Sequence, residues 1–276
     1  MAIDNNPLKQ YFRRPAIYLK LPSGGKNYPA GVLNIPETGE LPVYPMTAID
    51  EITTKTPDAL FNGTAVVEII KSCVPGIIDP WNLSSVDLDA VLIAVKSATG
   101  GNDLEVTSIC PKCGDDGKYG VNLVGLLTTL KAGDYDTELV INDLTFKFRP
   151  LTFKEMNQAS LGQFELQRVF AQLETMTDFD EKSAKTKEAL KNITAVTMEI
   201  LSKTIEHIKT PSVFVNQSEF ILDFLRNCDK NVYVKIRDHN AMLKQQTEVR
   251  PLKVVCVSCQ HEYEQEFTLN TSDFFD

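Results

Sequence analysis

The chain has 276 residues, of which 43% are hydrophobic and 24% charged, which is the composition of a folded protein with one large domain or two ordinary ones. The formal net charge of −9 argues against non-specific binding of the whole chain to nucleic acid or to an anionic membrane. No stretch approaches the ~20 consecutive apolar residues of a membrane span.

The opening stretch "MAIDNNPLKQYFRRP" has no apolar h-region, so we expect no signal peptide and a chain made and kept in a cytoplasm. The first fifty residues are punctuated by proline and glycine, and Ile17, Leu19 and Leu21 alternate with polar positions. This pattern predicts short strands joined by turns and excludes a long helix.

Helix starts are predicted by capping-box patterns, in which an acidic residue follows Thr, Ser or Asn by three positions. These patterns are Thr47 with Asp50, Ser84 with Asp87, Thr152 with Glu155, and Asn216 with Glu219. Apolar residues at helical spacing predict helices over 64–73, from 84 to Gly100–Gly101, over 153–208 as two helices split near "TMTDFDEKS", and through "VYVKIRDHNAMLKQQ". The second long helix would place His207 near its C-terminus. Between the helices, "ELVINDLTFKFRPL" predicts a hairpin that turns at Asn142–Asp143.

Two C-x-x-C pairs are the strongest chemical signal in the sequence. Cys110 and Cys113 form the first pair, and Cys256 and Cys259 form the second. When "CPKCGDDGKYGVNL" is placed beside "CVSCQHEYEQEFTL" without gaps, the cysteines and the flanking apolar positions coincide, and a strand-like lead-in precedes each pair. Two such knuckles supply the four thiolates of a tetrahedral zinc site. Because a shell of four cysteine ligands leaves no open position for water, we predict structural Zn²⁺.

The separation of the two pairs is unusual, because 142 residues lie between Cys113 and Cys256 whereas ~15–20 is common. We interpret the intervening helical segment as an insertion between the halves of a split zinc ribbon. Disulfides, a redox motif and unrelated thiols remain alternatives, as does His261 in place of one cysteine ligand, and the spacing does not distinguish zinc from iron. Cys73 and Cys228 lie in apolar helical contexts and are read as buried small hydrophobes.

The predicted fold class is α+β, with an extended strand-rich N-terminal part, a split zinc ribbon and a helical insertion between its knuckles. We expect four segments. They are an extended segment over 1–50, an α+β domain with the first knuckle and the hairpin over 51–150, a helical domain over 151–250, and the second knuckle with a C-terminal tail packed on the first knuckle over 251–276.

No catalytic constellation is recognisable, so we expect a protein that is not an enzyme and has no small-molecule substrate. The three histidines, His207, His239 and His261, lie near no nucleophile motif. "LPSGGKNYPAG" lacks the first glycine and the Ser or Thr of a phosphate-binding loop, and is read as a turn. Arg13, Arg14, Lys20 and Lys26 form a basic cluster near the N-terminus, which leaves nucleic-acid contact as a minor alternative.

Two N-terminal motifs, "YLKLPSGGKNYP" and "LPVYPMTAIDE", resemble the signature of the baseplate-hub proteins of T-even-like, contractile-tailed bacteriophages. The resemblance covers about the first fifty residues, and the two knuckles agree with long members of that group. It implies a structural subunit of the tail baseplate hub, made in the host cytoplasm and retained in the virion within a large symmetric assembly. The implied partners are the hub, spike and tape-measure proteins, with no membrane.

The resemblance also leaves open a transient assembly chaperone absent from the virion, and the zinc ribbon leaves open a nucleic-acid-binding module. Extended segments rich in proline and glycine can add strands to partner proteins, and exposed aromatic residues are candidate interface contacts. The aromatic candidates are Tyr28, Tyr44, Phe274 and Phe275, with packing inside this chain as the alternative for each.

Overall fold

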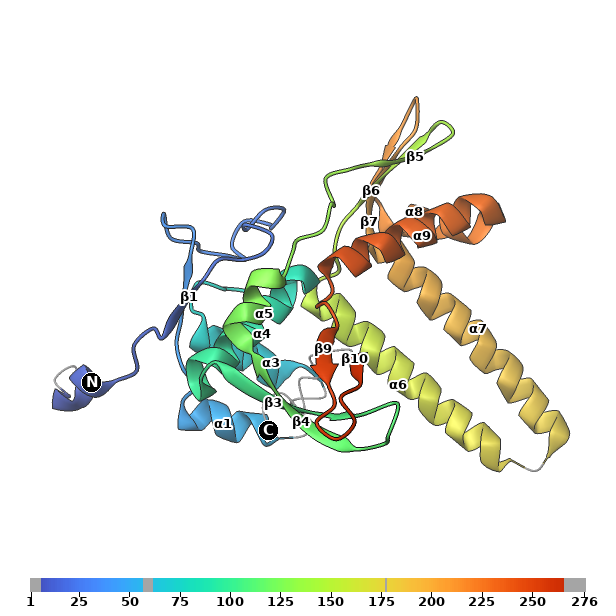
Figure 1. Ribbon diagram of the computed structural model, residues 1–276. Coiled ribbons are helices and arrows are strands. Elements are labelled where there is room, and N and C mark those ends of the chain that lie inside the picture. Colours follow the sequence, from blue (N-terminus) through green and yellow to red (C-terminus); the bar gives the residue numbers. More distant parts are fainter. Residues whose placement is uncertain (1–5, 57–61, 177, 266–276) are drawn as a thin grey trace. The chain divides into compact units, whose positions relative to one another are not determined.

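The computed structural model describes residues 6–56, 62–176 and 178–265. The chain divides into two compact units: unit 1 comprises residues 1–83, 87–130 and 249–276, and unit 2 comprises residues 84–86 and 131–248. Helices combine with small antiparallel sheets (Figure 1), which confirms the mixed helical and strand character predicted from the sequence. The four-segment division given above stays a prediction.

Unit 1 holds most of the first half of the chain and the last described strands. Its elements are η1 Pro7–Tyr11, β1 Ile17–Leu19, β2 Leu41–Val43, α1 Ala48–Thr54, α3 Thr64–Cys73, η2 Pro80–Asn82, α4 Ser85–Gly100 (from its third residue), β3 Asp103–Ile109, β4 Asp116–Asn122, α5 Leu123–Thr129, β9 Leu252–Val255 and β10 Glu262–Gln265. The run "AVLIAV" at 90–95 in α4 is buried at every position, as expected of a helix that is apolar on all sides and lies inside the core.

The turn in "LPSGGKNYP" is held by Asp87 on α4. The wholly buried carboxylate of Asp87 accepts hydrogen bonds from the backbone N–H of Ser23 at 2.9 Å, from the Ser23 hydroxyl at 2.5 Å and from the Tyr28 hydroxyl at 2.6 Å. Ser84 accepts from the backbone N–H of Val86 at the start of α4. In the sequence, Asp87 matches the acidic position of a capping box with Ser84. In the structure, its carboxylate binds a turn about sixty residues earlier in the chain.

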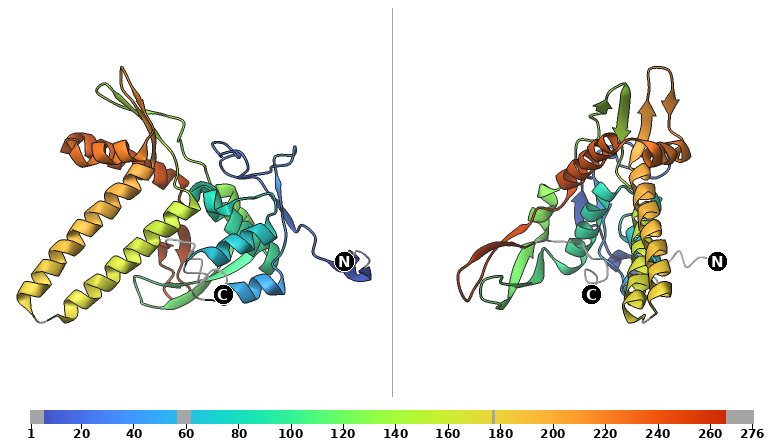
Figure 2. Two further views of the ribbon diagram at one scale, coloured as in Figure 1. Left: turned by 180° about the vertical axis from the view of Figure 1, so that it is seen from behind. Right: turned by 90° about the vertical axis from the view of Figure 1, so that its right-hand side faces the viewer.

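Unit 2 is built on a four-stranded antiparallel sheet of order β5-β6-β7-β8. Its elements are β5 Leu139–Ile141, β6 Leu144–Phe148, α6 Phe153–Thr175, α7 Phe179–Lys203, β7 Ile205–Lys209, β8 Phe214–Val215, α8 Ser218–Asn227 and α9 Lys230–Thr247. The predicted hairpin is confirmed as β5–β6, with Asn142 at a positive φ of 53° in the turn. Helices α6 and α7 run side by side in opposite directions (Figure 2).

The core of unit 2 joins the sheet to the helices α7, α8 and α9. Its buried side chains include Phe146 and Phe148 from β6, Ile205 and Ile208 from β7, and residues of the three helices. The strand pairing in this core shows that the predicted end of the second long helix is wrong. The second long helix ends at Lys203 and not at 208, because residues 205–209 pair with β6 as a strand with a bulge near Lys147. His207 therefore lies in β7, buried, with its ring 4.5 Å from that of Phe214.

A second correction concerns the start of α8. The predicted cap at Asn216 is wrong, since the N-cap is Gln217 and its side chain makes no capping hydrogen bond. The helix forms because its apolar face packs into the core, where Ile221 and Leu225 are buried. By contrast, α9 has a side-chain cap in Asp229, which accepts from two backbone N–H groups of the first turn.

The N-terminus of α6 has the predicted capping box, Thr152 with Glu155, and adds an ion pair with Arg149 at 3.0 and 2.6 Å. Burial acts to raise the pKa of Glu155, but hydrogen bonds from Arg149 and Thr152 outweigh it and hold the pKa below its ordinary value. A depressed acidic pKa stabilises the fold above the unfolded pKa and loses that effect as the pH falls through the folded pKa.

We therefore expect Glu155→Gln to lower the free energy of unfolding by roughly 1 kcal/mol at neutral pH. The difference from wild type should shrink as the pH falls below 4.5, the ordinary glutamate pKa. Chemical denaturation across pH measures it. Glu165→Gln, at an exposed position of the same helix, is the control. A pH-independent difference at Glu155 would contradict this explanation.

Candidate metal centre

Each predicted C-x-x-C pair lies in the tight connection of a two-stranded antiparallel hairpin. Cys110 and Cys113 follow β3 and precede β4, and Cys256 and Cys259 follow β9 and precede β10. Figure 2 shows the two hairpins side by side. The strand–knuckle–strand pattern predicted for both halves is confirmed over the described residues. The part of the predicted knuckle alignment beyond residue 265 lies outside the described residues. The candidate contact residues Phe274 and Phe275 also lie outside them.

The two knuckles repeat one backbone conformation. In each, the N–H of the first cysteine donates to the carbonyl five residues on, and the N–H four residues on donates back to that cysteine's carbonyl, all at 2.9 Å. The residue that follows the second cysteine has a positive φ in both knuckles, 73° at Gly114 and 56° at Gln260. A positive φ is uncommon for glutamine, so the second knuckle keeps this turn although its residue disfavours it.

The turns bring all four thiols together. The Sγ atoms of the two pairs lie within 4.8 Å of one another. Across the hairpins, Cys110 Sγ is 3.7 Å from Cys259 Sγ, and Cys113 Sγ is 3.6 Å from Cys256 Sγ. Tetrahedral zinc with ~2.3 Å bonds requires sulfur atoms about 3.8 Å apart. None of these cysteines is in a disulfide, and the four side chains could hold a metal ion.

Electrostatics favour a cation among these thiols. Burial acts to raise the pKa of Cys110, but hydrogen bonds from the backbone N–H groups of Cys113 and Lys112 and from neighbouring thiols lower it to about 7. At Cys113 the backbone N–H of Asp115 favours the thiolate, yet the adjacent thiols of the cluster outweigh it and raise the pKa to about 12. Four thiols this close ionise together only when a positive charge compensates them.

Further hydrogen bonds join the two hairpins beside the thiols. The Ser108 hydroxyl on β3 donates to Gln265 Oε1 at 2.6 Å and lies 3.0 Å from the Tyr263 hydroxyl on β10. Between the knuckles, the Ser258 hydroxyl donates to Asp115 at 2.6 Å. None of these residues was predicted from the sequence to join the two hairpins. Each partner lies more than 140 positions from the other, and no local pattern marks such a pair.

The remaining predicted positions lie apart from the thiol group. His261 is not among the groups of potential metal ligands found in the described residues, and its ring stacks near Tyr263 with centroids 6.2 Å apart. Cys73 is buried as predicted, and Cys228 is half-buried. His239 on α9 packs on Phe148 with ring centroids 4.8 Å apart.

The N-terminal candidates for contact with partners make contacts inside this chain. Tyr28 is half-buried and donates to Asp87, and Tyr44 is half-buried under the guanidinium of Arg13 at 5.7 Å from its ring centroid. The alternative of packing inside this chain therefore holds for both tyrosines. Arg13 also binds the backbone of Pro45 and Ser72, so it is not a free member of the basic cluster.

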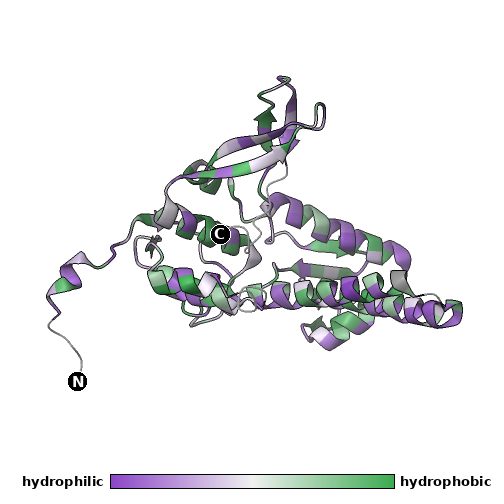
Figure 3. Cartoon of the chain, turned by 90° about the horizontal axis from the view of Figure 1, so that it is seen from below, coloured by the Kyte–Doolittle hydropathy of each residue, from purple (hydrophilic) through white to green (hydrophobic). Residues whose placement is uncertain are grey.

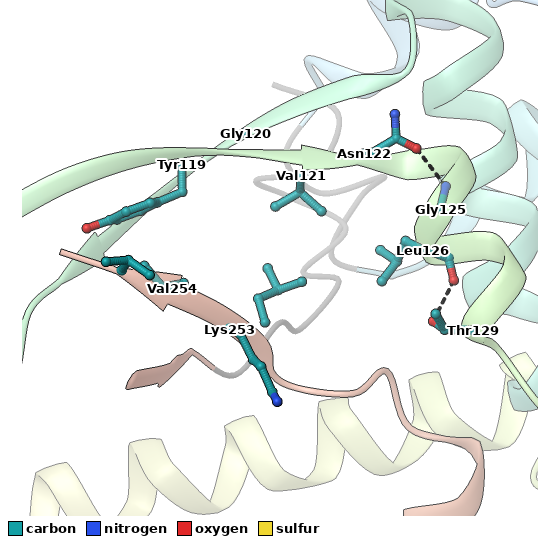
Figure 4. A pocket seen from close by; sticks show the side chains of 11 residues that line it. Tyr119, Gly120, Val121, Asn122, Gly125, Leu126, Thr129, Lys253 and Val254 are labelled. Carbon is teal, nitrogen blue, oxygen red and sulfur yellow. Dashed lines mark hydrogen bonds between the residues drawn. The ribbon is translucent and has the colours of Figure 1, made fainter. Parts of the chain in front are cut away.

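A hollow of about 380 Å³ lies in unit 1 between β4, α5 and β9 (Figure 4). The side chains of Val121, Leu126 and Val254 supply apolar parts of its lining. Tyr119 and Lys253 are the ionisable residues among those that line it.

Within the described residues, no helix is long and apolar enough to cross a membrane. The fold and the site define a mixed α/β protein in which two hairpins present four thiols able to hold a metal ion. The chain matches the family described as "T4 bacteriophage base plate protein" over residues 15–276 and belongs to that family. This confirms the resemblance seen in the N-terminal motifs: the chain is a phage baseplate protein. No curated protein and no solved structure gives a significant match.

Proposed function

We propose that the chain is a structural subunit of the tail baseplate hub, retained in the virion, that joins hub, spike or tape-measure proteins by protein–protein contacts. Membership of the baseplate family over residues 15–276 is the observation that carries this proposal. The hub assignment comes from the N-terminal motifs, "YLKLPSGGKNYP" and "LPVYPMTAIDE". The contact of the first motif with Asp87 supports a scaffolding role for it inside unit 1.

The four cysteines are proposed to form a split zinc ribbon, with Cys110, Cys113, Cys256 and Cys259 as ligands of one structural Zn²⁺. The sulfur spacing and the repeated knuckle support this assignment. A shell of four thiolates stabilises the fold and leaves no open coordination position for substrate. The zinc at this site would therefore be structural and not catalytic. The engagement of Arg13 inside the chain disfavours the nucleic-acid alternative.

The virion itself tests the structural role. Quantitative mass spectrometry of purified particles is expected to find the chain in a fixed ratio to the other baseplate proteins. A chain present in infected cells but absent from purified particles would contradict the structural proposal and would establish the assembly-chaperone alternative.

A further inference from the structure

The hollow between β4, α5 and β9 has apolar side chains in its wall. Val121 and Leu126 point into it (Figure 4), and Val254 borders it from β9. These three side chains are buried, while Lys253 beside them is exposed. The volume of about 380 Å³ is far larger than the ~30 Å³ share of one water molecule. Because apolar side chains offer water no hydrogen bonds and protein interiors are close-packed, the hollow is suited to apolar side chains.

The described part of β10 ends beside this hollow. Gln265 pairs with Leu252, and Leu252 lines the hollow. Residues that pair directly across an antiparallel ladder lie on the same face, so Gln265 lies on the face of Leu252. We call this face the inner face of the hairpin, because it meets β3: the Ser108 hydroxyl donates to Gln265 at 2.6 Å. The chain therefore reaches the hollow from β10 on the side that faces the first hairpin.

The first hairpin is longer than the described part of the second. Strands β3 and β4 have seven residues each, whereas β9 and β10 have four each. Both hairpins begin at knuckles whose thiols lie together, so the first hairpin extends past Gln265, and Val121 lines the hollow there. Hydrophobic residues are interspersed with hydrophilic ones along the strands of the hairpins (Figure 3), as expected where one face is covered.

The repeat of the knuckle indicates what can cover that face. Strands β4 and β10 each begin at the sixth residue after the first cysteine of their pair. In the first repeat, the positions 11 and 13 residues after that cysteine are Val121 and Leu123, and both are buried. In the second repeat, the same positions are Phe267 and Leu269. A strand that continued past Gln265 would place Phe267 on the inner face, because side chains alternate along a strand.

We propose that residues 266–276 dock in the hollow of their own chain, with Phe267 and Leu269 as the apolar contacts. The segment has three acidic residues and no basic residue, which is complementary to Lys253. It starts next to the hollow at Gln265, so closing the contact costs little chain entropy. Docking on β4 and α5 joins the second hairpin to the first at the end opposite the knuckles. The proposal depends on neither the metal nor the hub role.

Photo-cross-linking of the full chain tests the location of this segment. With p-benzoylphenylalanine in place of Phe267, irradiation should attach the side chain to residues 119–129 or 252–255 of the same chain, as identified by mass spectrometry. The same group in place of Thr268 is the matched control, because the neighbouring position faces the other way along a strand and should give a several-fold lower yield. No cross-link to these residues, or equal yields at the two positions, would overturn the proposal. A cross-link that joins two chains would overturn it as well and would assign the hollow to a second copy.

Hydrogen exchange measures whether the segment covers the hollow. Phe267→Asp should raise the exchange of the backbone amides of residues 119–129 by about tenfold, because a charged side chain is disfavoured in an apolar hollow. Thr268→Asp should leave this exchange unchanged. Both variants keep the four cysteines, so equal metal content separates loss of docking from loss of the thiol site. Exchange that is the same in both variants and in the wild type would overturn the proposal.

Discussion

Replacing Cys256 with serine is expected to abolish stoichiometric metal binding and to lower the free energy of unfolding of unit 1 by several kcal/mol. The change removes one ligand and leaves three thiols packed together without a complete shell. Binding of structural zinc contributes directly to folding, at about 10–16 kcal/mol in small zinc peptides. The larger core of unit 1 should make the net loss smaller here, at roughly 3–5 kcal/mol.

Chemical denaturation with parallel metal analysis measures this effect. A strong chelator should destabilise the wild type by a similar amount and should have little further effect on the Cys256→Ser variant, because both treatments remove the same interaction. Cys228→Ser is the control, since Cys228 is half-buried outside the thiol group and should keep the metal and cost about 1 kcal/mol. Unchanged stability and metal content in the Cys256→Ser variant would show that the two knuckles do not share a site.

The second large effect is expected at Asp87. Asp87→Ala should lower the free energy of unfolding by about 3 kcal/mol, because hydrogen bonds to a charged group contribute about 1.5–3 kcal/mol and their loss leaves buried donors unsatisfied. The donors are the backbone N–H and hydroxyl of Ser23 and the hydroxyl of Tyr28. Denaturant unfolding followed by circular dichroism measures the loss. The "LPSGGKNYP" turn should also become more accessible to proteolysis.

Asp89 lies two residues further along the same helix and is a control, because its replacement should change the free energy of unfolding in the opposite direction. Burial raises the pKa of Asp89 from 3.8 to about 6, so the ionised form is disfavoured in the folded state. That penalty is absent below 3.8 and fully present above about 6. Asp89→Asn should therefore leave stability unchanged or increase it at neutral pH. Equal losses for Asp87→Ala and Asp89→Asn would contradict the specific role of Asp87 in holding the turn.

The metal-centre candidates could be predicted because their signal is local and repeated. Each C-x-x-C pair fixes its own turn, and the matching flanks of Cys110 and Cys256 predicted the two hairpins. The hydrogen bonds between Ser108 and the residues of β10 could not be predicted in the same way. They depend on how two hairpins that are distant in sequence pack together. The residues around a serine in a strand do not indicate which distant residue it will hydrogen-bond to.

The errors have the same physical origin. Ile205 and Ile208 fit a helical stripe as well as they fit strand β7, and pairing with β6 decides between the two. The start of α8 likewise depends on the packing of Ile221 and Leu225 and not on a cap at Asn216. In both cases a tertiary contact overrides a local preference. At α4 the local signal and a distant contact coexist, because the Ser84 hydroxyl accepts from the backbone N–H of Val86 while the carboxylate of Asp87 binds Ser23 and Tyr28.

X-ray absorption spectroscopy at the zinc edge tests the central claim most directly, because it identifies the metal and its ligands in freshly purified, full-length protein. We expect one zinc per chain with four sulfur ligands at about 2.3 Å. A shell containing a nitrogen ligand would assign a role to a histidine such as His261. That result, a different metal, or substoichiometric zinc would contradict the four-cysteine site formed by Cys110, Cys113, Cys256 and Cys259.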